Sequence, residues 1–241
     1  MQYFIKEYLQ RQFNEQFFSL PKADVLAFYT RRMNNYLGKD SITVQHIADL
    51  HDLGYLPLEI KALPEGCRVP MKVPMLTIRN TKPEFFWLTN MLETLMSAVL
   101  WKPCASATTA QQYRRTFVQY ARDTVAENDL NFVPWQGHDF SFRGMSGVEN
   151  AIMSGAGHLL SFSGTDTIPA IDFLEMYYGA DSDRELVGGS VPATEHSVMC
   201  MGTQDNEIGA FEYLIGHVYP SGDPVKIIIG DPEEPVGSPW Q

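Results

Sequence analysis

Cysteine is scarce in this chain, and its pattern suits neither a disulfide framework nor a zinc site. Cys67, Cys104 and Cys200 are odd in number, lie far apart and form no CxxC pair. Disulfide scaffolds and zinc sites both depend on paired or closely spaced cysteines. We therefore expect a protein of a reducing compartment, with a cytoplasmic localisation.

Positive charge is scarce as well. The chain has 18 Lys and Arg residues against 29 Asp and Glu residues, so its formal net charge is −11. This balance opposes nonspecific attraction to nucleic acid phosphates and anionic lipids. We expect no nucleic-acid partner, and a small-molecule substrate is the better hypothesis.

Long apolar runs are missing too. No run approaches the roughly 20 residues that span a bilayer, and residues 1–8 lack the basic and apolar segments of a secretory signal. The sequence therefore predicts no membrane partner. With 241 residues, 44% of them hydrophobic, the chain is long enough to bury a substantial core.

Helical spacing of apolar residues dominates the first half of the chain. Ser41 is a candidate N-cap, and Pro103 is expected to end a helix. Residues 56–81 alternate and are broken by prolines, which indicates short strands and turns. The predicted helices cover residues 1–14, 22–37, 41–53, 83–101 and 106–126.

The second half alternates short strand-like pieces with helical ones, which is typical of an α/β fold. Strands are expected at 132–133 and 159–162, and helices at 147–157, 168–178 and 206–217. We expect three parts: a helical and β-rich N-terminal domain over 1–127, an α/β part over 128–220, and a tail over 221–241 rich in Pro, Gly and acidic residues.

The first segment that could carry chemistry is His138-Asp139-Phe140-Ser141-Phe142-Arg143-Gly144. An aromatic ring flanked by His138 and Arg143 could give a stacking platform and a cation for an anionic or heteroaromatic ligand. The structural alternative is a strand end with an internal pair between Asp139 and Arg143.

The second segment is Gly164-Thr165-Asp166-Thr167, at the end of an expected strand. Asp166 could be a helix N-cap, because short polar residues are common there. In the functional alternative, its carboxylate accepts a hydrogen bond from a ligand N–H and repels an anionic competitor.

The third segment runs from Gly188 to Ser197 and reads GGSVPATEHS. Its paired glycines allow a close approach of backbone to ligand, and Pro192 fixes the turn. His196 could be a base, a nucleophile or a hydrogen-bonded loop residue.

A metal site built from side chains is not expected. His138, Asp139, Glu149, His158 and His196 are possible ligands, but no HExxH or HxH spacing ties them together. A metal-dependent hydrolase using His138, Glu149 and His196 is therefore disfavoured.

Taken together and in this order, the three segments resemble nicotinamide phosphoribosyltransferases. Residues 56–66 and 86–94 are similar to that family as well, so the resemblance extends to about Tyr219. It implies a chain that joins nicotinamide to phosphoribosyl pyrophosphate and forms nicotinamide mononucleotide and pyrophosphate. It also implies that the second half is part of an α/β barrel.

The resemblance implies roles for particular residues. Phe140 stacks on the nicotinamide ring beside His138, and Arg143 lies near the ring or the phosphate. Asp166 accepts the amide N–H, and His196 is the histidine that the family phosphorylates. Ser190 and Val191 line the tunnel that leads to the ring.

The same resemblance implies Mg²⁺ bound with the diphosphate, ATP as an optional coupling substrate, and a homodimer. It implies chains about twice this length, and the tail after Tyr219 is similar to a later segment of the family. An Arg-Pro-Asp expected before Ser221 is absent from the sequence. The alternative function is therefore a catalytically incomplete remnant that binds ligand or a partner subunit without turnover.

Overall fold

The computed structural model describes residues 1–125, 130–190 and 206–218, together with Glu195, Ser197 and Cys200. The chain divides into two compact units, the first from Met1 to Trp101 and the second from Lys102 onward. The division falls inside one long helix, α3 (Trp87–Thr124). The domain limit expected at residue 127 lies outside the described residues, as does the tail over 221–241, and both stay predictions.

The first unit opens with helices. Two π-helical segments, η1 (Phe4–Gln12) and η2 (Asn14–Phe18), precede α1 (Lys22–Leu37) and α2 (Gln45–Leu53). The helix predicted over 22–37 is thus confirmed. Helices α1 and α2 both end at a glycine with positive φ, a conformation that favours glycine. Gly38 follows α1 with φ 100°, and Gly54 follows α2 with φ 75°.

Ser41 does not cap α2, so the N-cap prediction is wrong. Val44 stands at that position, and no side chain caps the helix there. The Ser41 hydroxyl instead donates to the carbonyl of Leu37 at 2.9 Å. It therefore satisfies an acceptor at the end of α1, where helix carbonyls lack partners within the helix.

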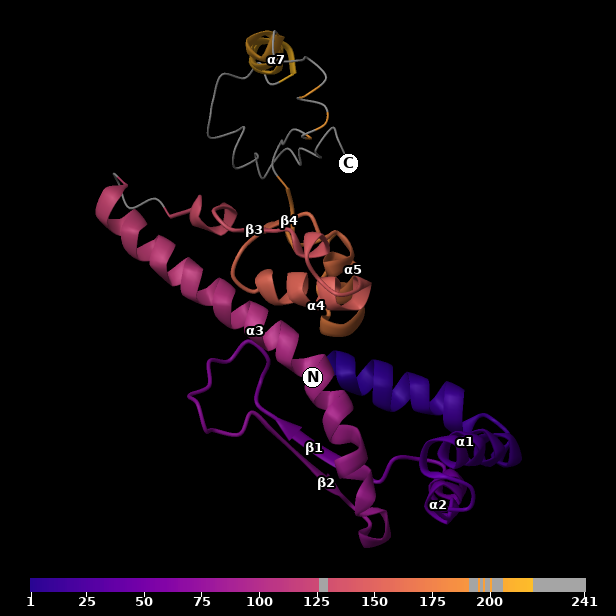
Figure 1. Ribbon diagram of the computed structural model, residues 1–241. Coiled ribbons are helices and arrows are strands. Elements are labelled where there is room, and N and C mark those ends of the chain that lie inside the picture. The colour runs from indigo at the N-terminus through magenta and orange to yellow at the C-terminus, as the bar shows by residue number, and fades with distance from the viewer. Residues whose placement is uncertain (126–129, 191–194, 196, 198–199, 201–205, 219–241) are drawn as a thin grey trace. The chain divides into compact units, whose positions relative to one another are not determined.

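A β-hairpin pair follows, as the alternation over 56–81 predicts. Strands β1 (Leu58–Ala62) and β2 (Leu76–Asn80) pair antiparallel, with Ile60 opposite Ile78 (Figure 1). On the other face Glu59 lies opposite Arg79 and forms an ion pair with it. Cross-strand pairs of both kinds stabilise a two-stranded ladder.

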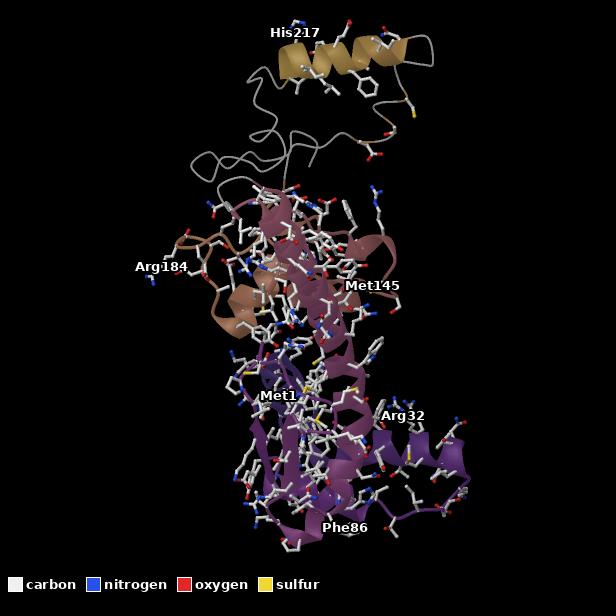
Figure 2. All side chains as sticks on the ribbon, turned by 90° about the vertical axis from the view of Figure 1, so that its left-hand side faces the viewer. Met1, Arg32, Phe86, Met145, Arg184 and His217 are labelled. Carbon is white, nitrogen blue, oxygen red and sulfur yellow. The ribbon has the colours of Figure 1, made fainter. Side chains whose placement is uncertain are left out.

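The core of the first unit gathers side chains from distant parts of the sequence. Phe4, Leu50 and Leu88 are fully or almost fully buried, and Phe85 joins them from the short helix η3 (Pro83–Phe85). The adjacent Phe86 points outward and is 75% exposed (Figure 2). Neighbouring residues of one turn thus face opposite environments.

Helix α3 is continuous from Trp87 to Thr124, so the helix end predicted near Pro103 is wrong. A proline inside a helix removes one hydrogen bond and costs roughly 3 kcal/mol. The segment contains no glycine that would complete a stop signal, and buried Val99 and Ala110 anchor the helix on either side of Pro103. The limit between the two compact units lies beside this proline.

The second unit alternates helices with very short strands. The predicted helices over 147–157 and 168–178 are confirmed within about a residue, and the helix over 206–217 divides into an α-helical and a π-helical part. The elements are η5 (Val133–Trp135), β3 (His138–Asp139), η6 (Ser141–Arg143), α4 (Val148–His158), β4 (Gly164–Thr165), α5 (Pro169–Tyr178), α7 (Glu207–Tyr213) and η8 (Leu214–Val218).

The strands predicted at 132–133 and 159–162 are wrong. Val133 begins η5, and the N–H groups of Leu159 and Phe162 donate to carbonyls of α4, so this apolar run extends the helix end. The strand lies two residues later, at Gly164, where a Cβ would be 2.6 Å from Nδ1 of His138. The lack of a side chain at Gly164, which leaves room for the His138 ring, rather than apolar content, suits this position to the strand pair.

The sheet of the second unit is parallel. His138 pairs with Gly164 and Asp139 with Thr165, and Gly189 forms a further parallel bridge to Gly164 (Figure 1). The fold is thus mixed α/β, as predicted, but within the described residues this sheet does not close into a barrel. In the same residues, no helix combines the length and the apolar character needed to cross a membrane.

Helix α4 packs closely because two of its residues lack side chains. A Cβ on Gly157 would lie 2.7 Å from the carbonyl oxygen of Pro103 in α3. A Cβ on Gly155 would lie 3.0 Å from Oδ2 of Asp139 and 3.1 Å from Cβ of Ala170 in α5. The two glycines therefore let α4 approach α3 on one side, and β3 and α5 on the other.

Candidate functional site

Three predicted site residues meet where β3 and β4 end. Nε2 of His138 lies 2.7 Å from Oδ1 of Asp166, and because a carboxylate only accepts, Nε2 carries the hydrogen. The ring of Phe140 lies 4.9 Å from the His138 ring at 38°. The carboxyl ends of parallel strands are where α/β folds place ligand-binding groups.

Phe140 and Asp166 are both accessible. The side chain of Phe140 is 51% exposed, and that of Asp166 is 44% exposed although it contacts His138. The N-cap alternative for Asp166 is wrong, because α5 has Ile168 at that position and no side-chain cap. The contact with His138 uses Oδ1 of Asp166, and nearly half of the side chain is still exposed.

Beneath these residues lies a buried carboxylate. Asp139 is 7% exposed and accepts hydrogen bonds from the hydroxyls of Ser141, Thr165 and Thr167. The structural alternative, an internal pair between Asp139 and Arg143, does not form within the described part of the chain, where these hydroxyls contact Asp139 and Arg143 is exposed. Three neutral hydroxyl groups thus stabilise the Asp139 carboxylate in place of the Arg143 cation.

A pocket of about 520 Å³ opens beside Phe140, entirely within the second unit. Four of its lining residues carry rings, Tyr113 and Phe117 on α3 and His138 and Phe140 at the strand end. Hydroxyl groups of Ser106 and Thr109 add hydrogen-bonding capacity. Aromatic walls with a few polar groups suit a small heteroaromatic ligand.

His158 also lines this pocket. Its ring stacks on Phe162 at 5.1 Å, and its Nε2 lies 3.1 Å from the carbonyl oxygen of Gly164. Burial lowers the pKa of His158 below its ordinary value, although the nearby Asp139 carboxylate and the Gly164 carbonyl oppose the shift. The neutral ring is the form that this site favours.

The remaining predicted residues are only partly placed. Arg143 ends η6 and is exposed, three residues after Phe140. Ser190 follows Gly189, whose bridge to β4 brings the third segment to the same strand ends. Val191 and His196 lie outside the described residues, so their roles stay predictions.

The described residues do not fit a metal ion held by side chains alone. Nowhere among them do three or more His, Cys, Asp or Glu side chains come close enough to hold one. Mg²⁺ usually binds through one or two carboxylates and substrate phosphates, so we assign it no ligand here. The hydrolase alternative finds no support among these residues either, and its His196 lies outside them.

The hydroxyl cluster around Asp139 and the position of His158 are absent from the sequence-based site. One signal for the cluster is present in Thr165-Asp166-Thr167. Thr165 and Thr167 both donate to Asp139, whereas Asp166 contacts His138, so the two threonines face one way and Asp166 the other. The sequence alone does not show that Asp139 lies beside the two threonines, so it could not link them to a buried carboxylate.

Comparison with known proteins gives a consistent result. Residues 135–217 match the nicotinate phosphoribosyltransferase (NAPRTase) family. Nicotinamide phosphoribosyltransferase of Acinetobacter baylyi is 55% identical over 222 residues, which is 92% of this chain and 43% of that protein. The Xanthomonas campestris enzyme of the same name is 33% identical over 175 residues, covering 73% of this chain and 36% of its own length.

A third relative, nicotinamide phosphoribosyltransferase of Mycoplasma genitalium, is 32% identical over 163 residues, or 66% of this chain and 33% of that protein. The chain thus spans less than half the length of the curated relatives it matches. The matched region contains the strand ends that carry His138, Phe140 and Asp166. On these matches the resemblance is confirmed: the chain is similar to nicotinamide phosphoribosyltransferases over most of its length, and residues 135–217 match the NAPRTase family.

Proposed function

We propose that this chain serves in nicotinamide phosphoribosyl transfer, the synthesis of nicotinamide mononucleotide within NAD biosynthesis. The observation that carries the proposal is the exposed ring of Phe140 beside a carboxylate, Asp166, that His138 holds in place. The names of the relatives support the same chemistry.

In this proposal Phe140 stacks on the pyridine ring, and Asp166 accepts the carboxamide N–H through Oδ2. His138 takes Oδ1 and so fixes the direction of the other oxygen. A carboxylate at this place repels nicotinate, whose own carboxylate would leave two negative charges adjacent. The site therefore selects the amide over the acid.

The reaction forms a bond between the pyridine nitrogen and the anomeric carbon of the ribose, and pyrophosphate leaves with the electron pair of the broken bond. The protein contributes chiefly by positioning the two substrates. We assign Arg143 to the ring or the phosphate, and Ser190 with Val191 to the ligand tunnel. His196 is the proposed site of phosphorylation when ATP is coupled to synthesis.

Mg²⁺ would enter with the diphosphate and neutralise its charge. Support for Mg²⁺ and ATP comes from the family resemblance alone. Assays of nicotinamide mononucleotide formation with and without each of them test these two roles. Neither is needed for the binding steps assigned to Phe140 and Asp166.

The second unit is proposed to be the start of an α/β barrel. Residues 138–139, 164–165 and 189 form successive parallel segments, and α4 and α5 connect them. Parallel neighbours joined in sequence order by helices are the repeating unit of such barrels. The remaining strands would come from the part of the family that this chain does not span.

We further propose a cytoplasmic homodimer. Cys67, Cys104 and Cys200 are exposed and form no disulfide in the described chain, which suits a reducing compartment. The dimer follows from the family resemblance. Sedimentation of the purified chain tests it directly.

The deciding experiment measures nicotinamide mononucleotide formation from nicotinamide, phosphoribosyl pyrophosphate, Mg²⁺ and ATP, with Asp166→Ala as the control. Product that is lost in the variant supports the proposal. A folded chain that binds nicotinamide but makes no product supports the second candidate, a ligand-binding chain without turnover.

A further inference from the structure

We propose that Asp139 is a positioning residue whose buried carboxylate sets the geometry of both ligand contacts, Phe140 and Asp166. The inference rests on the proposed function for the identity of its ligand, nicotinamide. Its structural part concerns the described residues alone. Asp139 itself touches no ligand in this scheme and acts through its neighbours.

The two oxygens of Asp139 reach different elements. Oδ1 accepts from the Ser141 hydroxyl of η6 at 2.5 Å. Oδ2 accepts from Thr165 of β4 at 3.2 Å and from Thr167 at 2.5 Å. A single carboxylate thus joins η6 to the segment that follows β4.

Each arm of this cluster brackets one proposed ligand contact. Phe140 stands between Asp139 and Ser141, and Asp166 stands between Thr165 and Thr167. The backbone adds a further link, because the N–H of Asp166 donates to the carbonyl of Asp139 at 2.9 Å. Movement of either arm therefore displaces a residue that the ligand would contact.

The cluster has little freedom to rearrange. Thr167 is completely buried, and Thr165 is 2% exposed. On the side of α4, a Cβ at Gly155 would already lie 3.0 Å from Oδ2. A buried carboxylate is costly unless it is hydrogen-bonded, so the hydroxyls are held to Asp139 and cannot turn elsewhere without loss.

The experiment separates positioning from simple stabilisation. Thr167→Val removes one hydroxyl at nearly constant volume, Thr167→Ser keeps it, and Thr116→Val is the control. Thr116 is an exposed residue of α3 whose hydroxyl donates to the carbonyl of Gln112. The readouts are the melting temperature, the Nε2 signal of His138 in ¹⁵N-histidine spectra, and the Kd for nicotinamide.

We expect Thr167→Val to shift the His138 signal and to weaken nicotinamide binding on the order of tenfold, the usual effect of losing one hydrogen bond to a charged group. Thr167→Ser should restore both readouts, and Thr116→Val should leave them as in the parent chain. The spectral shift is expected because Asp166, the partner of His138, adjoins Thr167.

A Thr167→Val chain with a lower melting temperature, an unmoved His138 signal and an unchanged Kd would overturn the inference, because the cluster would then serve the fold alone. If the parent chain binds no nicotinamide, the proposed function fails, and the His138 signal decides the positioning role by itself. Should Thr167→Val not fold, Ser141→Ala tests the other arm with the same readouts and the same outcomes.

Discussion

Phe140 and Phe142 are a natural pair for comparison, since they are 51% and 48% exposed and stand two residues apart. Only Phe140 lines the pocket and lies beside His138. Because aromatic stacking contributes about 0.5–1.5 kcal/mol, we expect Phe140→Ala to weaken nicotinamide binding roughly two- to tenfold. Calorimetric titration measures the effect.

Phe142→Ala is the matched control and should leave the affinity unchanged. Equal losses in the two variants would contradict the assignment of the ring contact to Phe140. They would point to a general disturbance of η6 (Ser141–Arg143), which follows Phe140 and contains Phe142.

His158 gives the site a dependence on pH. In the folded chain, burial lowers the pKa of His158 below its ordinary value of 6.5. At pH values below 6.5 the unfolded state therefore binds more protons than the folded state. Stability from the neutral ring is therefore fully present above about pH 6.5 and is lost as the pH falls toward the lowered value. We expect urea midpoints to decline between pH 7 and pH 5, and to decline less in His158→Gln.

Two nearby groups modify this titration. The Asp139 carboxylate favours the protonated ring, and His138 disfavours it, although burial is the largest influence on the pKa. A midpoint that changes with pH equally in the parent chain and in His158→Gln would show that other groups cause the dependence.

The sequence names the residues proposed to contact the ligand and misses those that support them. Phe140 and Asp166 could be named because the family resemblance assigns them to a ring and an amide, and the structure brings both to His138. The role of Asp139 depends on hydroxyls up to 28 residues away in sequence. Such a cluster exists only after the strands have paired.

At the scale of elements, the glycines of α4 (Val148–His158) should be among the least replaceable residues. We expect Gly157→Ala to destabilise the chain by about 1–3 kcal/mol, because its Cβ would lie 2.7 Å from the backbone oxygen of Pro103 and the helices would have to separate. Gly144→Ala is the control, since nothing lies within 4 Å of a Cβ there.

Chemical denaturation of both variants gives the measurement. A Gly157→Ala chain as stable as Gly144→Ala would mean that α3 and α4 are less closely packed in solution. Helix propensity works in the opposite direction, since alanine favours a helix over glycine by up to about 1 kcal/mol, so a loss in Gly157→Ala reports the contact.

Helices were easier to predict than strands for a physical reason. α1 (Lys22–Leu37), α4 and α5 (Pro169–Tyr178) are governed by local spacing and by end signals such as Pro21 and Gly179. β3 and β4 have two residues each, and their positions depend on pairing across 26 residues. The prediction at Pro103 was wrong because a local stop signal was outweighed by helix packing on both sides.

At the scale of the whole molecule, the two compact units have separate cores and should not unfold as one. Trp87 lies in the first unit and Trp135 in the second. In variants that retain one of these tryptophans alone, we expect different urea midpoints, and Gly157→Ala should shift the Trp135 transition more than the Trp87 transition.

Coincident midpoints in both variants, shifted equally by Gly157→Ala, would instead indicate a single cooperative unit. Matched Trp→Phe replacements in the parent chain serve as controls for the cost of removing each ring. The comparison is internal, because both reporters are measured on the same 241-residue chain.

The alternation in Thr165-Asp166-Thr167 limits how this segment can change length. Its threonines bind the buried Asp139, while Asp166 turns toward His138. Inserting or deleting a single residue would break this order, so the two hydroxyls and the Asp166 carboxylate could not all keep their present partners. A substitution here can remove one contact at a time, whereas a one-codon insertion or deletion would disturb the contacts of Asp139 and those of Asp166 together.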